Sequence, residues 1–551
     1  MSLQASLVRC FVLTLSGIFL RARFFDESFS PIWLSINFII LFFSAIVFWI
    51  LYNAFIYAYY TSPLRHLPAA KQRSVLQRLF KEPNAFHFET WINEQPDAEC
   101  IRYFGFLNSE RLLITSPAGV NQVLRLQGDK MRKQYAVKTQ LQRVSGENGL
   151  VVTDGDLHKK QRRIMDPTFR IGQIKSHFYP LFWRRSAEML EVIRSNEDKQ
   201  NSGSQQPQSD QQAMIRNMDD IFGRTIFDII GEASMTHDWK ALSSPGVYWT
   251  RLDKYREAIT PSKNTRDRIL LSFILPTCVL NALPFRFNTE TGPGLQRVRD
   301  ICKKSVATKC ERLARTDIEK SGMDMLDSIM RANRFHTMSF EELQDQAFMM
   351  QSGGSHTSVI ALLSTVYLLA QHRNSQTQLR EEIREMLPPC DQGSAINPDI
   401  FARMPYLDAV INEVLRLYSA FSWTGRVPTT DVVLFDTTIP KGTALSISPW
   451  ALHRSFKLWG ADAKEFKPER WLNGSPTVPR EPCSFISFGA GATKCIAEDF
   501  AKAELRCVIA ALFGRYEIAF PEGQALPGFT HQVAFAFRKP ILVRLDSIDG
   551  W

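Results

Sequence analysis

The stretch that decides the fold is Phe488-Gly489-Ala490-Gly491-Ala492-Thr493-Lys494-Cys495-Ile496-Ala497, and a helix-forming run follows it from Glu498. This order predicts that the Cys495 thiol lies at the mouth of a helix. The small residues before Cys495 let backbone N–H groups approach its sulfur closely. Those N–H groups and the helix dipole favour the thiolate form of the side chain. The sequence therefore predicts a metal-binding thiolate at this position.

Cys495 is one of nine cysteines, which are widely scattered and include no pair with C-x-x-C spacing. The chain is therefore not a disulfide scaffold, and most of it is expected to face a reducing compartment. A single thiolate in a tight apolar loop, with Phe488 upstream, suits the axial position of a haem iron. Cys495 is thus the predicted iron ligand, and the pattern indicates an oxygen-activating enzyme.

The composition allows a large buried core. Of the 551 residues, 45% are hydrophobic and 39 are Phe, and no long linker divides the chain. The net charge is +10 and the pI is near 9.1. Because the chain has no zinc spacing, recognition-helix pattern or arginine tract, these values do not indicate nucleic acid binding. The basic surface is expected either to be solvated or to meet an acidic partner protein or anionic lipid.

Residues 31–60 are predicted to form a transmembrane helix. No charged side chain occurs between Glu27 and Arg65, and the nearly apolar run from Ile32 to Tyr52 is long enough to cross a bilayer, which needs ~20 residues. Aromatic residues near both ends resemble interfacial belts. A cleaved signal peptide and a core helix are the alternatives.

Residues 1–30 form a separate N-terminal segment. Its apolar part, residues 10–20, is too short to span a bilayer and is expected to lie at the membrane interface. More basic residues follow the predicted span than precede it, which places the large domain in the cytoplasm.

Residues 61–551 are predicted to form one domain that is mainly α with small β-sheets. Strand signals occur at Ile101–Phe104 and Arg111–Ile114, and the alternating tail Gln532–Leu545 predicts a terminal β-hairpin. The polar, Gln/Ser-rich residues 196–212 predict a disordered loop between two helices.

Pro405–Tyr418 is predicted to be an amphipathic helix on which Glu413 and Arg416, spaced i, i+3, share one face. Alone, this pair equally suits a surface ion pair. The downstream segment Phe466–Trp471 contributes Arg470, which could close a three-membered network with them. A buried network of this kind fixes geometry more than it adds stability.

A basic segment, Asp154–Arg163, is predicted to present hydrogen-bond donors to an acidic group. On a helix, His158 and Arg162 face one way, and Lys159 and Arg163 face another. Two donors one turn apart suit a pair of carboxylates such as the haem propionates. The other basic face suits an electron donor, and a solvated basic helix is the alternative.

A long helix over Ser339–Gln371 is predicted to begin with a capping box formed by Ser339 and Glu342. Two glycines, at 353–354, fall in its middle, where each weakens a helix by up to ~1 kcal/mol. They predict a local opening in which the Thr357 hydroxyl and a water can reach oxygen. Tight helix–helix packing on the glycines is the alternative.

With these segments in this order, the chain from Pro63 to its end resembles the cytochrome P-450 family of haem-thiolate monooxygenases. The cysteine loop resembles the family pattern Phe-x-x-Gly-x-Arg-x-Cys-x-Gly, and the chain is similar to membrane-bound members from filamentous fungi. The resemblance implies a mostly helical, prism-shaped fold with haem b (iron protoporphyrin IX) between the Thr357 helix and the Cys495 helix. The matching residues are Phe488, Gly491, Cys495, Glu413, Arg416, Pro468, Glu469, Arg470, Gly354 and Thr357.

The chain departs from the family pattern at several positions, including His158 for the common Trp and Ala497 for the final Gly, and two further departures affect the predicted chemistry. Thr493 replaces the usual Arg that binds a propionate, so Arg426 and the pair His158 and Arg162 are expected to hold the propionates instead. His356 replaces the usual acid that relays protons. Because a histidine can relay protons near neutral pH, His356 is expected to do so or to have a structural or substrate-contact role.

The resemblance implies an oxidoreductase that incorporates molecular oxygen into an apolar small molecule, in particular a fungal secondary-metabolite intermediate. It implies electrons from NADPH through a separate reductase, with cytochrome b5 as an additional donor. It also implies a single-pass protein of the endoplasmic reticulum membrane with a cytosolic catalytic domain, which substrate reaches partly from membrane lipid. Substrate contacts are expected from Phe421, Ser422, Trp423 and residues 533–535.

Two other functions stay open. A haem-thiolate isomerase or dehydratase would need neither O2 nor a reductase, and His356 keeps this function open. A membrane-anchored haem-binding protein without turnover is the second.

Overall fold

The computed structural model of the chain describes residues 16–17, 31–72, 74–201, 215–244, 263–272, 275, 277–289, 292–315, 324–333, 337–390, 396–472, 478–531 and 533–551. Most of the predicted N-terminal segment, residues 1–30, therefore lies outside the described residues, and so does the predicted loop beyond residue 201.

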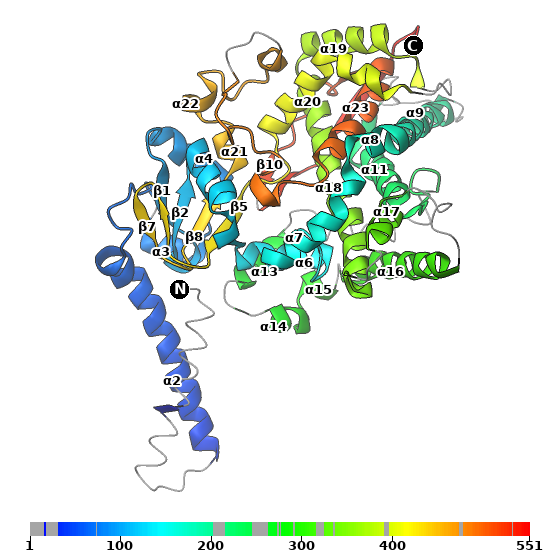
Figure 1. Ribbon diagram of the computed structural model, residues 1–551. Helices are drawn as coiled ribbons and strands as arrows, with labels where there is room; N and C mark the ends of the chain where they lie inside the picture. Colours follow the sequence, from blue (N-terminus) through cyan, green and yellow to red (C-terminus); the bar gives the residue numbers. More distant parts are fainter. Residues whose placement is uncertain are drawn as a thin grey trace.

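The described part of the chain is mainly helical with small sheets, as predicted (Figure 1). Helix α9 continues to Asn201, so residues 196–201 are helical and not loop as expected. The longer helices are α2 (Pro31–Leu51), α4 (Ala85–Glu94), α6 (Tyr135–Ser145), α7 (Gly155–Met165), α9 (Tyr179–Asn201), α11 (Met218–Met235), α13 (Lys263–Ser272), α16 (Gly292–Arg315), α18 (Phe340–Leu369), α19 (Arg373–Met386), α20 (Pro405–Leu417) and α23 (Glu498–Arg515). The shorter helices are α3 (Val75–Phe80), α5 (Pro117–Asn121), α8 (Ile171–Gln173), α14 (Thr277–Ala282), α15 (Arg286–Thr289), α17 (Met325–Ala332), α21 (Pro449–Leu452) and α22 (Phe456–Trp459).

The largest sheet has the strand order β1-β2-β8-β5-β3. The β2–β8 pair is parallel and the other pairs are antiparallel. Its strands are β1 (Cys100–Phe104), β2 (Glu110–Ile114), β3 (Met131–Lys133), β5 (Thr424–Pro428) and β8 (Ala444–Ile447). The smaller sheets contain β4 (Ile215–Asn217), β6 (Val432–Leu434), β7 (Thr437–Ile439), β9 (Tyr516–Ala519), β10 (Phe529–His531), β11 (Phe535–Phe537) and β12 (Leu542–Ser547).

The predicted terminal hairpin within Gln532–Leu545 is wrong. Strand β11 pairs with β10, in the register Phe529 to Phe537, whereas β12 pairs with β4 and β9. Alternation along a strand reports which face is buried, but it does not identify the partner strand. The tail therefore joins two different sheets.

Helix α18 forms the centre of the helical core. The Ser339 side chain accepts from the Glu342 N–H, and the Glu342 side chain accepts from the Ser339 N–H, so the predicted capping box is confirmed. The helix runs without interruption through the two glycines, so the predicted local opening is wrong. A Cβ at Gly354 would lie 2.8 Å from the Ile230 Cδ1 atom, so this glycine serves helix packing.

Apolar side chains form two main cores, one among the helices and one between α4 and the largest sheet. In Figure 1 this sheet lies beside the base of α2, and α2 extends away from the rest of the molecule. Over the described residues, no helix taken alone has both the length and the apolarity of a membrane span. One pair, α18 with α19, meets that test jointly by length and composition, with a bend of 115° between them.

Candidate active site

Cys495 lies in a turn between the short helix η11 (Gly491–Thr493) and α23. The Cys495 N–H donates to the Phe488 carbonyl at 2.8 Å, and the Lys494 N–H donates to the Gly491 carbonyl at 3.0 Å. These bonds close the loop on itself, and the Cys495 side chain is exposed. The predicted position of the thiol before a helix is therefore confirmed.

The loop depends on two glycines in left-handed backbone conformations. Gly489 has φ +73° and Gly491 has φ +68°. A Cβ on Gly491 would lie 1.9 Å from the Leu124 carbonyl oxygen, whereas a Cβ on Gly489 would have no atom closer than 3.9 Å. Gly491 thus lets the loop pack against the backbone of η3 (Gln122–Leu126), which the sequence did not indicate.

The protein alone does not favour the Cys495 thiolate. One side of the thiol is open, but the protein packed around the rest raises its pKa, and the Glu498 carboxylate acts in the same direction. The Ala497 N–H, Arg162 and Lys494 lower the pKa, as expected for a helix mouth, but they do not outweigh burial. Deprotonation would then depend on the charge of a bound metal ion, which deprotonates a coordinating thiol.

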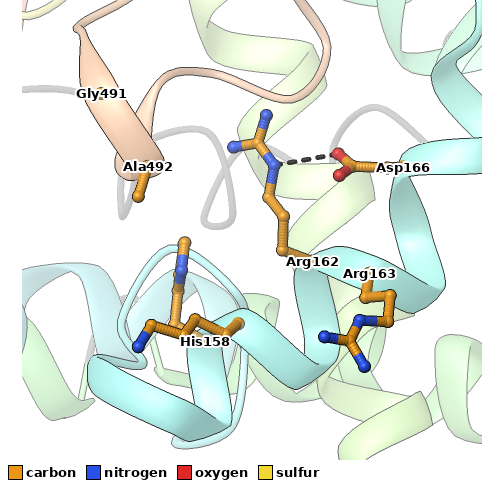
Figure 2. Close-up of a pocket in the computed structure, with 7 residues that line it drawn as sticks. His158, Arg162, Arg163, Asp166, Gly491 and Ala492 are labelled. Carbon is orange, nitrogen blue, oxygen red and sulfur yellow. Dashed lines mark hydrogen bonds and ion pairs between the residues drawn. The ribbon is translucent and has the colours of Figure 1, made fainter. Parts of the chain in front are cut away.

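A basic cavity of about 420 Å³ lies next to the cysteine loop (Figure 2). Figure 2 shows Gly491 and Ala492 of the loop on one side of the cavity and His158 on the other, with Arg162 turned toward Asp166. The Arg162 Nε donates to the Asp166 Oδ1 at 2.9 Å, and its Nη1 donates to the Lys494 carbonyl. The residues that line the cavity are His158, Lys159, Arg162, Arg163, Asp166, Gly491 and Ala492.

Arg426 reaches the cysteine loop from strand β5. Its Nη2 donates to the Thr493 hydroxyl at 3.1 Å, and its Nη1 donates to the Thr424 hydroxyl at 2.9 Å. The side chain is buried, and burial lowers its pKa. Strand β5 therefore places a cation next to Thr493, the residue that replaces the Arg of the family pattern.

Lys133, which the sequence analysis did not single out, completes this group of cations. Its Nζ donates to the Thr153 carbonyl at 2.6 Å and to the Asp154 Oδ1 at 3.3 Å. Burial and Arg426 lower its pKa to about 8. The sequence does not mark Lys133, because its place opposite Arg426 comes from the pairing of β3 with β5 in the folded chain.

These cations fit the carboxylates of a haem. Burial, Lys133 and Arg162 lower the pKa of His158 to about 4, so the ring is neutral and can donate without adding charge. Among the described residues, Asp154 is the carboxylate that acts on His158, Lys133 and Arg426. Lys133 and Arg426 are thus opposed by one carboxylate, and Arg162 is already paired with Asp166, so a haem propionate would balance the remaining positive charge.

The predicted network of Glu413, Arg416 and Arg470 forms, and all three side chains are fully buried. Arg416 makes two bonds of 2.8 Å to the Glu413 carboxylate, and the Arg470 Nε donates to it at 3.1 Å. The Trp471 Nε1 and the Lys467 N–H donate to the same carboxylate at 2.8 and 3.0 Å. The buried charges are therefore compensated by hydrogen bonds.

His453 connects this network to the cysteine loop. Its Nδ1 donates to the Arg416 carbonyl at 3.0 Å, and its Nε2 accepts from the Ile486 N–H at 3.0 Å. Burial lowers its pKa to about 3, so one ring nitrogen remains an acceptor. Ser487 adds a second tie, because its hydroxyl donates to the Leu415 carbonyl at 2.7 Å. Ile486 and Ser487 immediately precede Phe488, so helix α20 holds the start of the loop.

On α18, the Thr357 hydroxyl donates to the Gly353 carbonyl at 2.7 Å. Burial lowers the pKa of His356 to about 4, and its Nε2 has no hydrogen-bond partner in the described structure. His356 is therefore neutral at neutral pH, unlike an exposed histidine, and its predicted role as a proton relay stays a prediction. Burial, which the sequence does not reveal, causes the difference.

Glu504 is a buried acid that the sequence analysis missed. It lies on α23, and the Ser358 hydroxyl of α18 donates to its Oε2. Burial raises its pKa to about 8, and its Oε1 has no partner in the described structure. The sequence does not mark it, because Glu504 lies two residues from both Lys502 and Arg506 and reads as an ordinary charged residue. The bond joins the Cys495 helix to the residue that follows Thr357.

The predicted substrate contacts lie close to the largest sheet. Ser422 is fully buried, and its hydroxyl bonds to the His531 Nδ1 at 2.8 Å. Trp423 belongs to the core next to that sheet, where its ring lies 6.5 Å from Phe88. Phe421 is half-buried and forms an isolated bridge with Ala534, so the two predicted contact segments lie together.

The comparisons with known proteins agree with this geometry. A sequence model of the family Cytochrome P450 matches residues 101–543. The chain is 31% identical to cytochrome P450 monooxygenase sphH of Aspergillus fumigatus, over 91% of this chain and 92% of that protein. It is 28% identical to cytochrome P450 monooxygenase ALT8 of Alternaria alternata, over 91% and 93%, and 29% identical to cytochrome P450 monooxygenase buaD of Petromyces alliaceus, over 94% of each. The chain is therefore a haem-dependent monooxygenase that belongs to the cytochrome P450 family.

Proposed function

We propose that this protein oxidises an apolar small molecule, an intermediate of a fungal biosynthetic pathway, with O2 and with electrons from NADPH through a separate reductase. The observation that carries the proposal is the exposed Cys495 thiol at the start of α23. Its loop is fixed by hydrogen bonds from Ile486 to His453 and from Ser487 to the Leu415 carbonyl of α20. When bound, haem b supplies an iron that activates O2, and an axial thiolate favours cleavage of the O–O bond.

The residues of this chain would hold the haem at its iron and at its propionates. Cys495 would be the axial ligand, with Phe488 and Gly491 shaping its loop. His158, Arg162 and Arg426 would bind the propionates, and Lys133 would add a fourth donor. The support is the surplus of buried positive charge around these side chains and the cavity that His158 and Arg162 border.

Proton supply would fall to residues near the end of the glycine segment of α18. The Thr357 hydroxyl donates a hydrogen bond to the Gly353 carbonyl, so its lone pairs can accept a hydrogen bond from a water. Glu504, with a pKa of about 8, holds a proton at neutral pH, and its carboxyl group accepts a hydrogen bond from the Ser358 hydroxyl. Because His356 is neutral and its Nε2 is unpartnered, it would shape the site and contact substrate.

The protein would act at the endoplasmic reticulum membrane as a single-pass protein with its catalytic domain in the cytosol. Helix α2 would be the anchor, because many of its large apolar side chains are exposed. A reductase, with cytochrome b5 as a second electron donor, would bind the catalytic domain near the membrane surface. The membrane lipid would supply the apolar substrate. Phe421, Ser422 and Trp423 would contact that substrate.

The decisive experiment is a reduced-plus-CO difference spectrum of the purified holoprotein. The wild type and Cys278→Ala, which removes an exposed cysteine outside the site, should both give the Soret shift of a thiolate ligand. Cys495→Ala should lose it. A thiolate-type shift that survives Cys495→Ala would overturn the proposal.

A second measurement tests turnover. NADPH consumption with a reductase and a panel of apolar substrates should depend on O2. Product formation without NADPH would favour an isomerase or dehydratase, and no consumption with any substrate would favour a haem-binding protein without turnover.

A further inference from the structure

A ladder of three charged side chains, Lys494, Glu498 and Lys502, begins beside Cys495 and continues along α23. The Lys494 Nζ lies 2.5 Å from the Glu498 Oε2, and the Lys502 Nζ lies 3.0 Å from the Glu498 Oε1. Glu498 and Lys502 share a helix face by their i, i+4 spacing, and Lys494 reaches the carboxylate from the cysteine loop. Glu498 is therefore the centre of the ladder.

The Glu498 carboxylate is directed back toward the cysteine loop. Side chains of a helix point toward its N-terminus, so a carboxylate in the first turn lies over the residues that precede it. The Lys494–Glu498 ion pair spans Cys495 in the sequence. The Lys502 Nζ lies 5.6 Å from the centre of the Phe488 ring, at the other end of the loop. The ladder thus extends along the loop that holds the thiol.

Glu498 carries a negative charge at neutral pH. Burial raises the pKa of Glu498, but the two lysines outweigh burial and hold this pKa below its ordinary value. The Oε2 atom is buried, so water screens its charge less than it screens a surface carboxylate. The same charge raises the pKa of the Cys495 thiol. A thiolate with a more basic sulfur is a stronger electron donor.

An acid in the first turn also stabilises a helix through the helix dipole. Asp499 occupies the same turn of α23 and is exposed. It points about 100° away from Glu498 around the helix axis, because a helix has 3.6 residues per turn. Asp499 therefore offers a matched comparison, with the same charge in the same turn but on a different face.

We propose that Glu498 strengthens electron donation from the Cys495 thiolate and thereby lowers the reduction potential of the haem. This inference rests on the proposed role of Cys495 as the axial ligand. Reduction of the ferric haem takes up one electron from the reductase, and so adds one negative charge near the carboxylate. Lys494 and Lys502 offset part of this effect. Glu498 is a positioning residue, because it acts through Cys495 and not by contact with substrate.

The test is a spectroscopic redox titration of the purified holoprotein at pH 7.5, with dithionite and mediator dyes. In Glu498→Gln, the ratio of ferrous to ferric haem at a fixed solution potential should rise about threefold or more. For a one-electron couple this is a positive shift of about 28 mV. Asp499→Asn should leave the potential unchanged. Glu498→Asp keeps the charge and should restore most of the wild-type value.

Lys502→Met separates an effect of charge from a disturbance of the loop. Met keeps the apolar contact with Phe488 but removes a positive charge from the ladder. The potential should therefore shift in the negative direction, opposite to the shift in Glu498→Gln. Both variants should keep the thiolate-type CO spectrum, because the Cys495 N–H still donates to the Phe488 carbonyl.

Equal potentials for the wild type and Glu498→Gln, or the same shift in Glu498→Gln and Asp499→Asn, would overturn the inference. So would a positive shift in Lys502→Met. Loss of the thiolate-type CO spectrum in Glu498→Gln would also overturn it, because Glu498 would then hold the structure of the loop. A wild type without that spectrum would instead refute the proposed function, so the two failures are distinct.

Discussion

The Arg426 guanidinium donates from its Nη2 to the Thr493 hydroxyl across 3.1 Å, and so joins strand β5 to the loop that carries Cys495. Thr493 occupies the position at which the family pattern has a propionate-binding Arg. The charge that the loop has lost is thus restored from a different strand. The Thr493 hydroxyl acts as the acceptor that fixes this replacement.

Arg426→Gln should therefore weaken haem retention by about tenfold or more, because the charge-assisted bond that we propose between Arg426 and a propionate would be lost. Thr493→Ala should have a smaller effect, since Arg426 keeps its bond to Thr424. The measurement is the rate of haem transfer to an excess of apomyoglobin. Equal rates for the wild type and Arg426→Gln would contradict this role.

Gly491→Ala should disturb the cysteine loop more than Gly489→Ala. Both glycines have positive φ, which costs an alanine about 1–2 kcal/mol. Only at Gly491 would the new Cβ also meet the Leu124 carbonyl, at 1.9 Å. We expect Gly489→Ala to retain the thiolate-type CO spectrum at a reduced unfolding temperature, and Gly491→Ala to lose the spectrum. The opposite order would show that the contact with Leu124 does not position the loop.

Glu504 should make the protein less stable as pH rises from 4.5 to 8. Its folded pKa of about 8 exceeds its ordinary value of 4.5, so the folded state holds a proton that the unfolded state has released. Stability then falls across this window by up to about 1.4 kcal/mol per pH unit and levels off above it.

Glu504→Gln should remove this slope, which unfolding temperatures measured from pH 5 to 9 would show as a flatter curve than that of the wild type. Ser358→Ala is the matched variant: the Ser358 bond lowers the pKa of Glu504, so its loss should extend the slope to higher pH. Parallel curves for all three proteins would refute the assignment.

Arg416→Ala should cost about 3–5 kcal/mol, because it leaves the fully buried Glu413 carboxylate without its bidentate partner. Arg506→Ala is a suitable comparison. Its bidentate pair with Asp408 is partly exposed, at 20% and 36%, so its loss should cost only about 1 kcal/mol. Urea unfolding of both variants gives the two costs, and equal costs would show that burial is not the deciding factor.

Local spacing made much of this site predictable. Glu413 and Arg416 share a helix face by their i, i+3 spacing, and the order of the segments led to Arg470, all of which the structure brings together. The mainly helical fold and the capping box at Ser339 were predictable for the same reason. Each depends on residues close in sequence.

What could not be predicted depends on burial and on distant partners. Glu504 and His356 have ordinary identities, and their shifted pKa values arise only from the apolar surroundings that folding creates. The partners of β12 come from β4 and β9, which no local alternation reveals.

The Glu413 carboxylate also imposes an order on biosynthesis. It receives its last side-chain donor from Trp471, which lies 58 residues further along the chain. A nascent chain that has emerged only to α20 carries this acid without Arg470 or Trp471, and a lone charge cannot be buried at that stage. The core around α20 can therefore close only after Arg470 and Trp471 have emerged from the ribosome. Translation that stops earlier leaves a product that cannot complete its core.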